Sequence, residues 1–169
     1  KDILMQGCLA INNSTYGVRA SGGVMPTSYL WENGVIWQSG TAVYMTSSTA
    51  NQFRNSLLQG SGAGARVYDI GLGASLVSDY NNFAITNNAI LVEKRRSAGG
   101  SEIHNFVSSW AFASGQDRHS LSHVPLFADA DSWDFHLKSA QGRYEPGTGY
   151  ATNDAPGIYS PMLDTGDPS

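Results

Sequence analysis

The sequence predicts an all-β solenoid, a right-handed parallel β-helix of about four coils of 22–25 residues with an irregular C-terminal capping region. Three observations favour this fold class. Strand-like runs rich in Val, Ile, Tyr and Leu recur at a nearly constant spacing, and small turn-forming residues separate them. Helical periodicity is almost absent from the first hundred residues.

The repeat is clearest in four segments that align on one apolar anchor each. These segments are Gly17-Val18-Arg19-Ala20, Ala42-Val43-Tyr44-Met45, Arg66-Val67-Tyr68-Asp69 and Ala89-Ile90-Leu91-Val92. The anchor is the second residue of each segment, and the step from one anchor to the next shortens slightly along the chain. A period of about 24 residues with two or three short strands fits one coil of a β-helix, whose strands stack about 4.8 Å above those of the previous coil.

A second set of apolar anchors lies seven to nine residues upstream of the first, and Asn, Gly and Ser separate the two sets as turn residues. The upstream anchors are Ile11, Ile36, Leu58 and Phe83. Leucine-rich repeats have a similar period, but their Leu-x-x-Leu-x-Leu pattern is missing. An antiparallel sandwich also has short strands, yet nothing in that fold requires anchors at a fixed spacing.

The period ends near Lys94, so residues 1–93 are expected to form the coils and residues 94–169 the cap and wrapping loops of the same domain. The segment from Ile103 to Phe112 can form a short helix or a wrapping loop. A solenoid must close its open end, because the last coil exposes its core and its unpaired backbone groups.

The C-terminal half carries a more specific resemblance. It lies in Trp110, Gly115-Gln116-Asp117, His119-Ser120, Pro125-Leu126-Phe127, Asp134-Phe135-His136-Leu137-Lys138 and the run from Ser160 to Pro168. In this order, from about Ser78 to Ser169, they resemble the C-terminal segment of bacterial right-handed β-helix repeat proteins of the pectin-lyase-like superfamily. The resemblance implies a secreted or surface-attached bacterial protein and says little about activity.

The same resemblance implies that the chain is a fragment. In such proteins the Ser-Pro-…-Asp-x-Gly element leads into one more strand, whereas this sequence stops at Ser169 and opens directly in strand-like sequence at Lys1. The expected partners therefore include the rest of a parent chain on both sides.

Composition excludes several classes of protein. Charged residues are only 14% of the chain and the net charge is -4, which argues against nucleic acid, because phosphate binding needs clustered Lys and Arg. Aromatic residues at 11% argue against disorder. Cys8 is the only cysteine, which rules out an internal disulfide, and no apolar run has the length of a membrane helix.

The candidate ligand-binding residues are Arg19, Tyr44, Arg66 and Tyr68. If each anchor points into the coil, its neighbours point outward, and they stack as Arg19, Tyr44, Tyr68, Leu91 and as Gly17, Ala42, Arg66, Ala89. Sugars stack on aromatic faces, and Arg pairs bidentately with carboxylates such as those of uronic acids. The alternative is that these side chains only stabilise a flat sheet face as cross-strand pairs.

A catalytic site is harder to assemble from this sequence. A lyase needs a base and a group that neutralises the substrate carboxylate, and a glycosidase needs two carboxylates roughly 5 to 9.5 Å apart. The predicted sheets offer only Asp69, Asp79 and Glu93, at different lateral positions. No catalytic residue is assigned.

No cofactor and no metal site are predicted. The segment Asp129-Ala-Asp131-Ser-Trp-Asp134 has the carboxylates of a calcium loop but lacks its Gly and terminal Glu, so an Asx turn is the alternative. His119 and His123 have the spacing of zinc ligands on a helix, but the residues around them suggest extended chain.

Taken together, these features predict an extracellular or cell-surface β-helix module that contacts polysaccharide and is not catalytic within this chain. One alternative is the C-terminal fragment of a polysaccharide lyase or glycoside hydrolase acting on acidic glycans, with its main site upstream. A second alternative is a purely structural surface rod.

Overall fold

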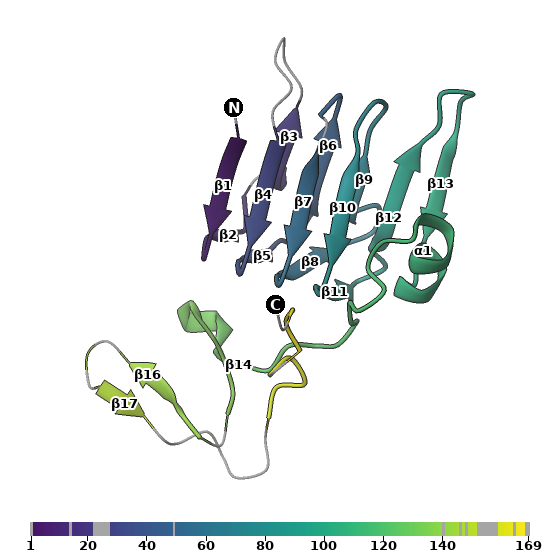
Figure 1. Ribbon diagram of the computed structural model, residues 1–169. Coiled ribbons are helices and arrows are strands. Elements are labelled where there is room, and N and C mark those ends of the chain that lie inside the picture. Colours follow the sequence, from purple (N-terminus) through teal and green to yellow (C-terminus); the bar gives the residue numbers. More distant parts are fainter. Residues whose placement is uncertain are drawn as a thin grey trace.

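A computed structural model describes residues 2–13, 15–21, 28–48, 50–139, 141–145, 147, 149–151, 159–163 and 165–167. The chain folds into a parallel β-solenoid with an irregular C-terminal region along one side (Figure 1). Successive strands follow one another around the solenoid, and each pairs with the strand one coil away rather than with its sequence neighbour. The fold class predicted from the repeat is confirmed.

Three parallel sheets form the walls of the solenoid. Sheet A contains β1 (Asp2–Gln6), β4 (Ser28–Glu32), β7 (Asn51–Arg54) and β10 (Leu76–Asp79). Sheet B contains β2 (Leu9–Ile11), β5 (Val35–Trp37), β8 (Leu57–Ser61) and β11 (Asn82–Thr86). Sheet C contains β3 (Tyr16–Ser21), β6 (Thr41–Thr46), β9 (Arg66–Ile70) and β12 (Ile90–Arg95), to which β13 (Ser101–His104) adds in antiparallel direction. Four coils result, stacked through about three turns.

The corner between sheets A and B repeats one backbone conformation in every coil. Gly7, Asn33, Asn55 and Tyr80 stand there with φ between 51° and 61°, in the left-handed region that Gly and Asn adopt most easily. The next position turns inward, where the amide of Asn81 binds the Phe53 carbonyl at 2.8 Å and the Ser56 N–H at 3.1 Å. These bonds satisfy buried backbone groups at the corner.

The core lies between the three sheets. Sheet B contributes the predicted anchors Ile36, Leu58 and Phe83, all buried, while Ile11 in the first coil is half-buried. Sheet A adds Trp31 and Phe53, and sheet C adds an apolar stack from each coil. Burial of these side chains is the main term that stabilises the stacked coils.

The register of sheet C corrects one prediction. Val18 pairs with Val43 as expected, but Val43 pairs with Tyr68, and Tyr68 pairs with Val92. In the last two coils the equivalent positions are therefore Tyr68 and Val92 rather than Val67 and Ile90. Tyr68 belongs to the inward stack, and the prediction that it lies on the outer face is wrong.

A break in the alternation of inward and outward residues near the start of the strands of sheet C explains the error. In β6 and β9 two adjacent apolar residues are both buried, Ala42 with Val43 and Val67 with Tyr68. In the first coil a Cβ on Gly17 would lie 2.3 Å from the Ile36 side chain, so this position also faces the core. Strict alternation fails at these positions, which is why Gly17, Ala42, Ala89 and Leu91 are not on the outer face either.

The segment that follows β13 covers the last coil. After β13 the chain forms α1 (Val107–Ser114), which buries Trp110 and ends at Gly115 in the left-handed conformation. The following extended segment hydrogen-bonds to the fourth coil: the Asp117 N–H donates to the Ser78 carbonyl at 2.7 Å, and Leu121 pairs with Asn81 and Phe83 at 2.8 and 2.9 Å. The predicted capping role of this region is consistent with these bonds.

The tail then runs beside sheet B, drawn in light green and yellow below the solenoid in Figure 1. Its elements are β14 (Phe127–Asp129), the 3-10 turn Ala130–Ser132, β15 (Asp134–Leu137), β16 (Arg143–Glu145) and β17 (Gly149–Ala151). Phe127 packs edge-on against Trp37 of sheet B at 5.0 Å between ring centroids. Asp164 and Pro168 of the terminal motif lie outside the described residues.

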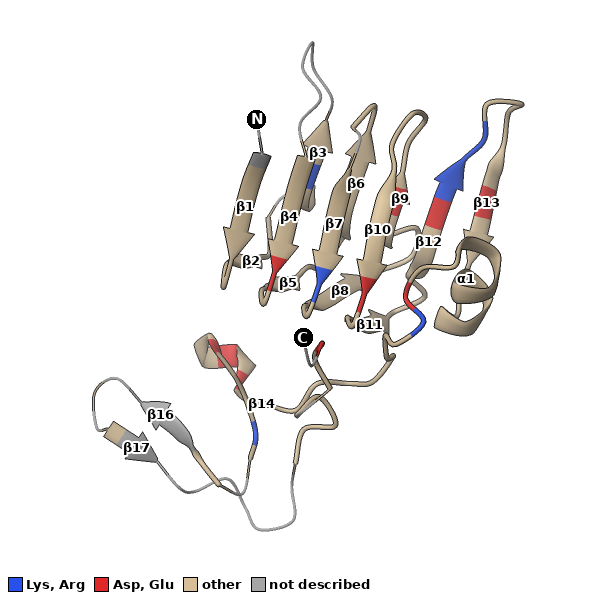
Figure 2. Cartoon of the chain, viewed as in Figure 1, with Lys and Arg blue, Asp and Glu red and all other residues tan. Residues whose placement is uncertain are grey.

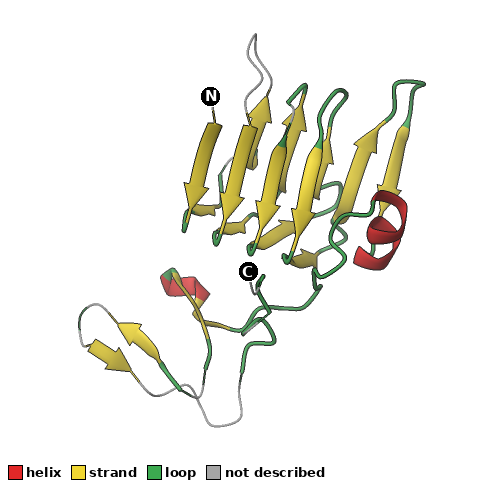
Figure 3. Cartoon of the chain, in the orientation of Figure 1, coloured by secondary structure: helices red, strands yellow, loops and turns green. Residues whose placement is uncertain are grey.

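Strands and turns dominate the described part, and helix is confined to α1 and one short turn (Figure 3). Neither is long and apolar enough to cross a membrane.

Candidate ligand-binding face

The outer face of sheet C carries a column of polar and aromatic side chains. Arg19, Tyr44, Asp69 and Glu93 are register partners on β3, β6, β9 and β12. Charged residues of this sheet lie on β9, β12 and β13 at the capped end, and Arg19 lies on β3 (Figure 2). Aromatic groups and Arg19 therefore face outward near the first two coils, and the other charges lie near the last two.

Two tyrosines stack on this face. The rings of Tyr16 and Tyr44 lie 4.8 Å apart at an interplanar angle of 18°, and the Arg19 guanidinium lies 5.7 Å from the centre of the Tyr44 ring. Tyr16 is not among the predicted residues, because strict alternation from Val18 places it inside. Its stacking on Tyr44 shows that alternation fails at Gly17 and that Tyr16 faces outward.

Arg66 points outward as predicted, but its charge is already compensated. Its Nε and Nη2 atoms lie 2.6 and 2.5 Å from Glu93 Oε2, and its Nη1 donates to the Gly64 carbonyl at 2.5 Å. The Ser101 hydroxyl donates to the other oxygen of Glu93 at 2.7 Å. These hydrogen bonds, from Ser101 first and then Arg66, lower the pKa of Glu93.

Asp69 stands between the tyrosines and this ion pair. The residue is only 5% exposed, and its Oδ1 atom is buried without a hydrogen-bond partner. The Arg95 Nε lies 3.9 Å from that atom, which is an ion-pair distance but too long for a hydrogen bond. Burial raises the pKa of Asp69, against the opposing effect of Arg66 and Arg95.

A groove of about 380 Å³ lies along the start of β3, β6 and β9. Its lining is mainly the turn residues before these strands, together with Tyr16, Thr41, Arg66 and Asp69. The face thus combines an aromatic ring, a guanidinium and a buried carboxylate around one concavity.

Of the four predicted residues, the structure brings three to the outer face. Arg19 is exposed, and Tyr44 and Arg66 are half-buried. Tyr68 is fully buried instead, with its ring 5.7 Å from Phe53 and 5.6 Å from Phe83 and its hydroxyl 2.9 Å from Ser78 Oγ. Burial, with the nearby charge of Asp117, raises the pKa of Tyr68 well above its ordinary value.

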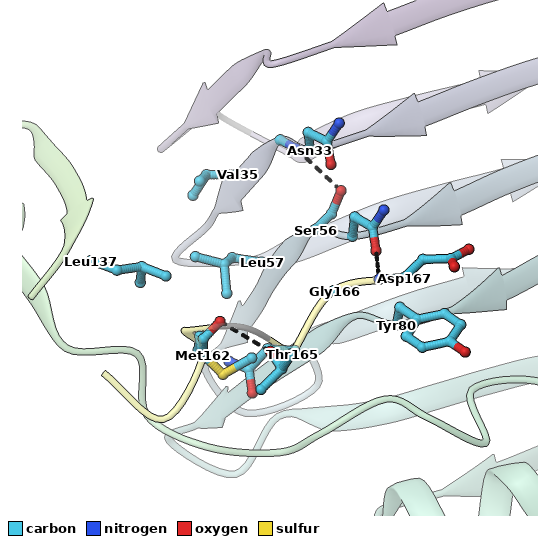
Figure 4. A pocket seen from close by; sticks show the side chains of 13 residues that line it. Asn33, Val35, Ser56, Leu57, Tyr80, Leu137, Met162, Thr165, Gly166 and Asp167 are labelled. Carbon is cyan, nitrogen blue, oxygen red and sulfur yellow. Dashed lines mark hydrogen bonds between the residues drawn. The ribbon is translucent and has the colours of Figure 1, made fainter. Parts of the chain in front are cut away.

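A second groove, of about 400 Å³, lies where the C-terminal segment passes the corner between sheets A and B (Figure 4). Val35, Leu57, Leu137 and Met162 give it an apolar lining. The Asp167 N–H donates to Asn55 Oδ1 at 2.8 Å and ties the segment to the solenoid.

The acidic and histidine residues of the cap form local hydrogen bonds. Asp129 accepts the Ser132 N–H and hydroxyl at 3.2 and 2.7 Å, which is the Asx turn alternative to a calcium loop. His119 donates to or accepts from Asp79 at 2.8 Å and stacks on Tyr80 at 4.8 Å. Within the described ranges, no group of three or more His, Cys, Asp or Glu residues is placed to hold a metal.

Comparisons with protein-family models, with curated proteins and with solved structures found no match for this chain. The kinship with pectin-lyase-like proteins, the bacterial origin and the secreted location therefore stay predictions. The geometry of sheet C and its groove is therefore the basis for a proposed function.

Proposed function

We propose that this chain is an extracellular β-solenoid module that contacts polysaccharide through the outer face of sheet C and does not itself catalyse a reaction. The observation that carries the proposal is the stacked Tyr16–Tyr44 pair beside the groove lined by Arg66 and Asp69. Aromatic faces, guanidinium donors and a carboxylate acceptor are the groups that bind the apolar faces and hydroxyls of sugars.

The geometry of a solenoid suits an extended ligand. Equivalent side chains of neighbouring coils are about 4.8 Å apart, so one feature of the face repeats along the solenoid axis. The groove spans three coils, from Tyr16 in the first to Asp69 in the third. A polymer lying along the axis can therefore contact Tyr16, Tyr44 and Asp69 in succession.

The carboxylates of this face are arranged in a way that favours glycan binding over glycoside hydrolysis. Glycoside hydrolysis requires two carboxyl groups flanking the scissile bond. Asp69 lines the groove, but Glu93 is held by Arg66 and Ser101 and is not part of its lining. One available carboxylate supports binding through a hydrogen bond and leaves the acid–base pair of a glycosidase incomplete.

A binding screen against neutral and acidic polysaccharides tests the proposal, with Tyr44→Ala as the informative variant. Loss of a stacked ring is expected to weaken binding by about fivefold to tenfold, measured by isothermal titration calorimetry. The proposal fails if no glycan binds or if Tyr44→Ala binds as tightly as the wild type.

Tyr80→Ala is the matched control. Tyr80 also carries a stacked, accessible ring, but it lines the groove at the corner between sheets A and B. It is expected to leave the affinity unchanged. If Tyr80→Ala weakens binding and Tyr44→Ala does not, the ligand lies in the other groove and sheet C is the wrong face.

A further inference from the structure

The unpaired oxygen of Asp69 is the feature of this face that packing alone leaves unexplained. Buried polar atoms in folded proteins nearly always have a hydrogen-bond partner. Asp69 Oδ1 has none, although the residue is only 5% exposed and forms part of the wall of a groove. A strong acceptor in this position requires a donor, and the groove is where a ligand would bring one.

The charges around the groove determine which ligands can enter. Arg66 is neutralised by Glu93 in a close ion pair, so it offers no uncompensated charge to a ligand carboxylate. The side chain of Arg95 is half exposed and 3.9 Å from Asp69, where solvent weakens its effect. Arg19 lies two coils away from Asp69 in the same column.

An anionic sugar would therefore meet a buried carboxylate rather than a free cation. Like charges in a partly desolvated groove repel more strongly than in water. A neutral sugar has no such penalty, and its hydroxyl group can donate to the Asp69 carboxylate.

Resting on the proposed function, we infer that Asp69 is a specificity-determining residue that makes the groove a site for neutral sugar units and disfavours uronates. The hydroxyl of the sugar donates its hydrogen bond to the Asp69 carboxylate, while Tyr16 packs against the ring. This assignment gives Arg66 a positioning role in the wall of the groove, in place of the uronate pairing expected from the sequence.

The test uses matched pairs of polysaccharides, each uronate polymer (polygalacturonate, alginate and hyaluronan) beside its own methyl-esterified form, together with neutral glucan, galactan and xylan. Affinities are measured by calorimetry for the wild type, Asp69→Asn and Glu32→Gln. Glu32 supplies the control because it is a carboxylate on the outer face of sheet A, where it pairs with Arg54. Thermal unfolding confirms that each variant is folded.

For the wild type, the esterified form is expected to bind about tenfold more tightly than the acid form at low salt, with a smaller ratio at high salt. Asn keeps an acceptor oxygen without the charge. Asp69→Asn should therefore bring the ratio of the affinities for the esterified and acid forms close to one. Glu32→Gln should leave it unchanged.

Equal binding of the esterified and acid forms by the wild type overturns the inference, and so does a ratio that survives in Asp69→Asn. In both cases the proposed function stands, because glycan still binds. If none of the polysaccharides binds to the wild type, the proposed function itself fails. An Asp69→Asn variant that does not fold leaves the wild-type ratio and its salt dependence to decide.

Discussion

Asp117 joins the cap to the solenoid through a network of side-chain hydrogen bonds. Its Oδ1 accepts from the hydroxyls of Ser78 and Ser120 at 2.7 Å each and from the Asn81 amide at 3.4 Å. Its Oδ2 accepts from the Trp110 indole at 3.0 Å. Burial raises the pKa of Asp117, and these hydrogen bonds act in the opposite direction. One buried carboxyl thus holds together sheet A, the corner of the fourth coil and α1.

Asp117→Ala should lower the free energy of unfolding by about 3 kcal/mol, because it leaves several buried donors without an acceptor. Urea denaturation followed by circular dichroism measures the change. Asp131→Ala, at an exposed position, should change stability by less than about 0.5 kcal/mol. Equal effects of the two substitutions would mean that the network does not hold the cap.

Asp69 should make stability depend on pH in a defined direction. Its pKa is raised by burial, and Glu93 adds to that effect while Arg66 and Arg95 oppose it. The folded state therefore binds the proton more tightly than the unfolded chain, so this residue's contribution to stability falls as pH rises from the ordinary value of 3.8 towards the raised pKa. Asp69→Asn removes this pH-dependent contribution to the free energy of unfolding.

The measurement is the difference in unfolding free energy between Asp69→Asn and the wild type at pH 4 and pH 7. The variant should gain stability relative to the wild type at the higher pH. Carboxylates with lowered pKa that do not interact with Asp69, such as Asp79, destabilise both proteins alike as pH falls and cancel in the difference. A difference that does not change with pH contradicts the burial of an ionisable group at this position.

Tyr68→Phe separates the core role of Tyr68 from the binding role first expected of it. Removing the hydroxyl deletes the hydrogen bond to Ser78 and should cost about 1 kcal/mol of stability. Glycan affinity should stay as in the wild type, since the side chain is fully buried. Weaker glycan binding by a well-folded Tyr68→Phe would show that Tyr68 does reach the ligand.

At the scale of the strand, the period of the sequence predicts the stacking but not the register of every rung. A nearly constant spacing of the anchors suffices to identify coils, because parallel strands repeat the same apolar positions. Val67 and Tyr68 are adjacent and both face the core, so either one fits the position of Val43 in an alignment. Only the register of the folded sheet decides between them, in which Val43 pairs with Tyr68.

Register and alternation also decide how much of the candidate face could be predicted. Arg19 and Tyr44 follow the anchors of the first two coils, where the predicted register holds. Arg66 also faces outward. Asp69 was missed because it lies on the outer face only in the true register, and Tyr16 was missed because alternation fails at Gly17. A signal for Asp69 does exist, since the step from Tyr44 to Asp69 equals the step from Arg19 to Tyr44.

At the scale of the whole molecule, the two ends of the solenoid differ. The fourth coil is covered by β13, α1 and the segment around Asp117. In the described part of the chain, β1 pairs only with β4, and Leu4 on this edge strand is 60% exposed. A groove of about 450 Å³ opens beside it between sheets A, B and C. Such an edge is a template for pairing with another strand.

Leu4→Lys should therefore reduce self-association of the chain at high concentration, because a charge on an edge strand disfavours pairing with a second copy. Multi-angle light scattering after gel filtration gives the mass directly. Val77→Lys provides the comparison, since Val77 is similarly exposed but lies on β10, next to the capped end. A wild type that stays monomeric at all concentrations would contradict this expectation.

The most direct test of glycan contact through sheet C is a backbone amide NMR titration with the polysaccharide that binds best in the screen. Chemical-shift changes are expected to concentrate at Tyr16, Arg19, Tyr44, Arg66 and Asp69. Changes centred instead on Asn33, Asn55 and Tyr80, or spread evenly over the surface, would contradict the proposed binding face.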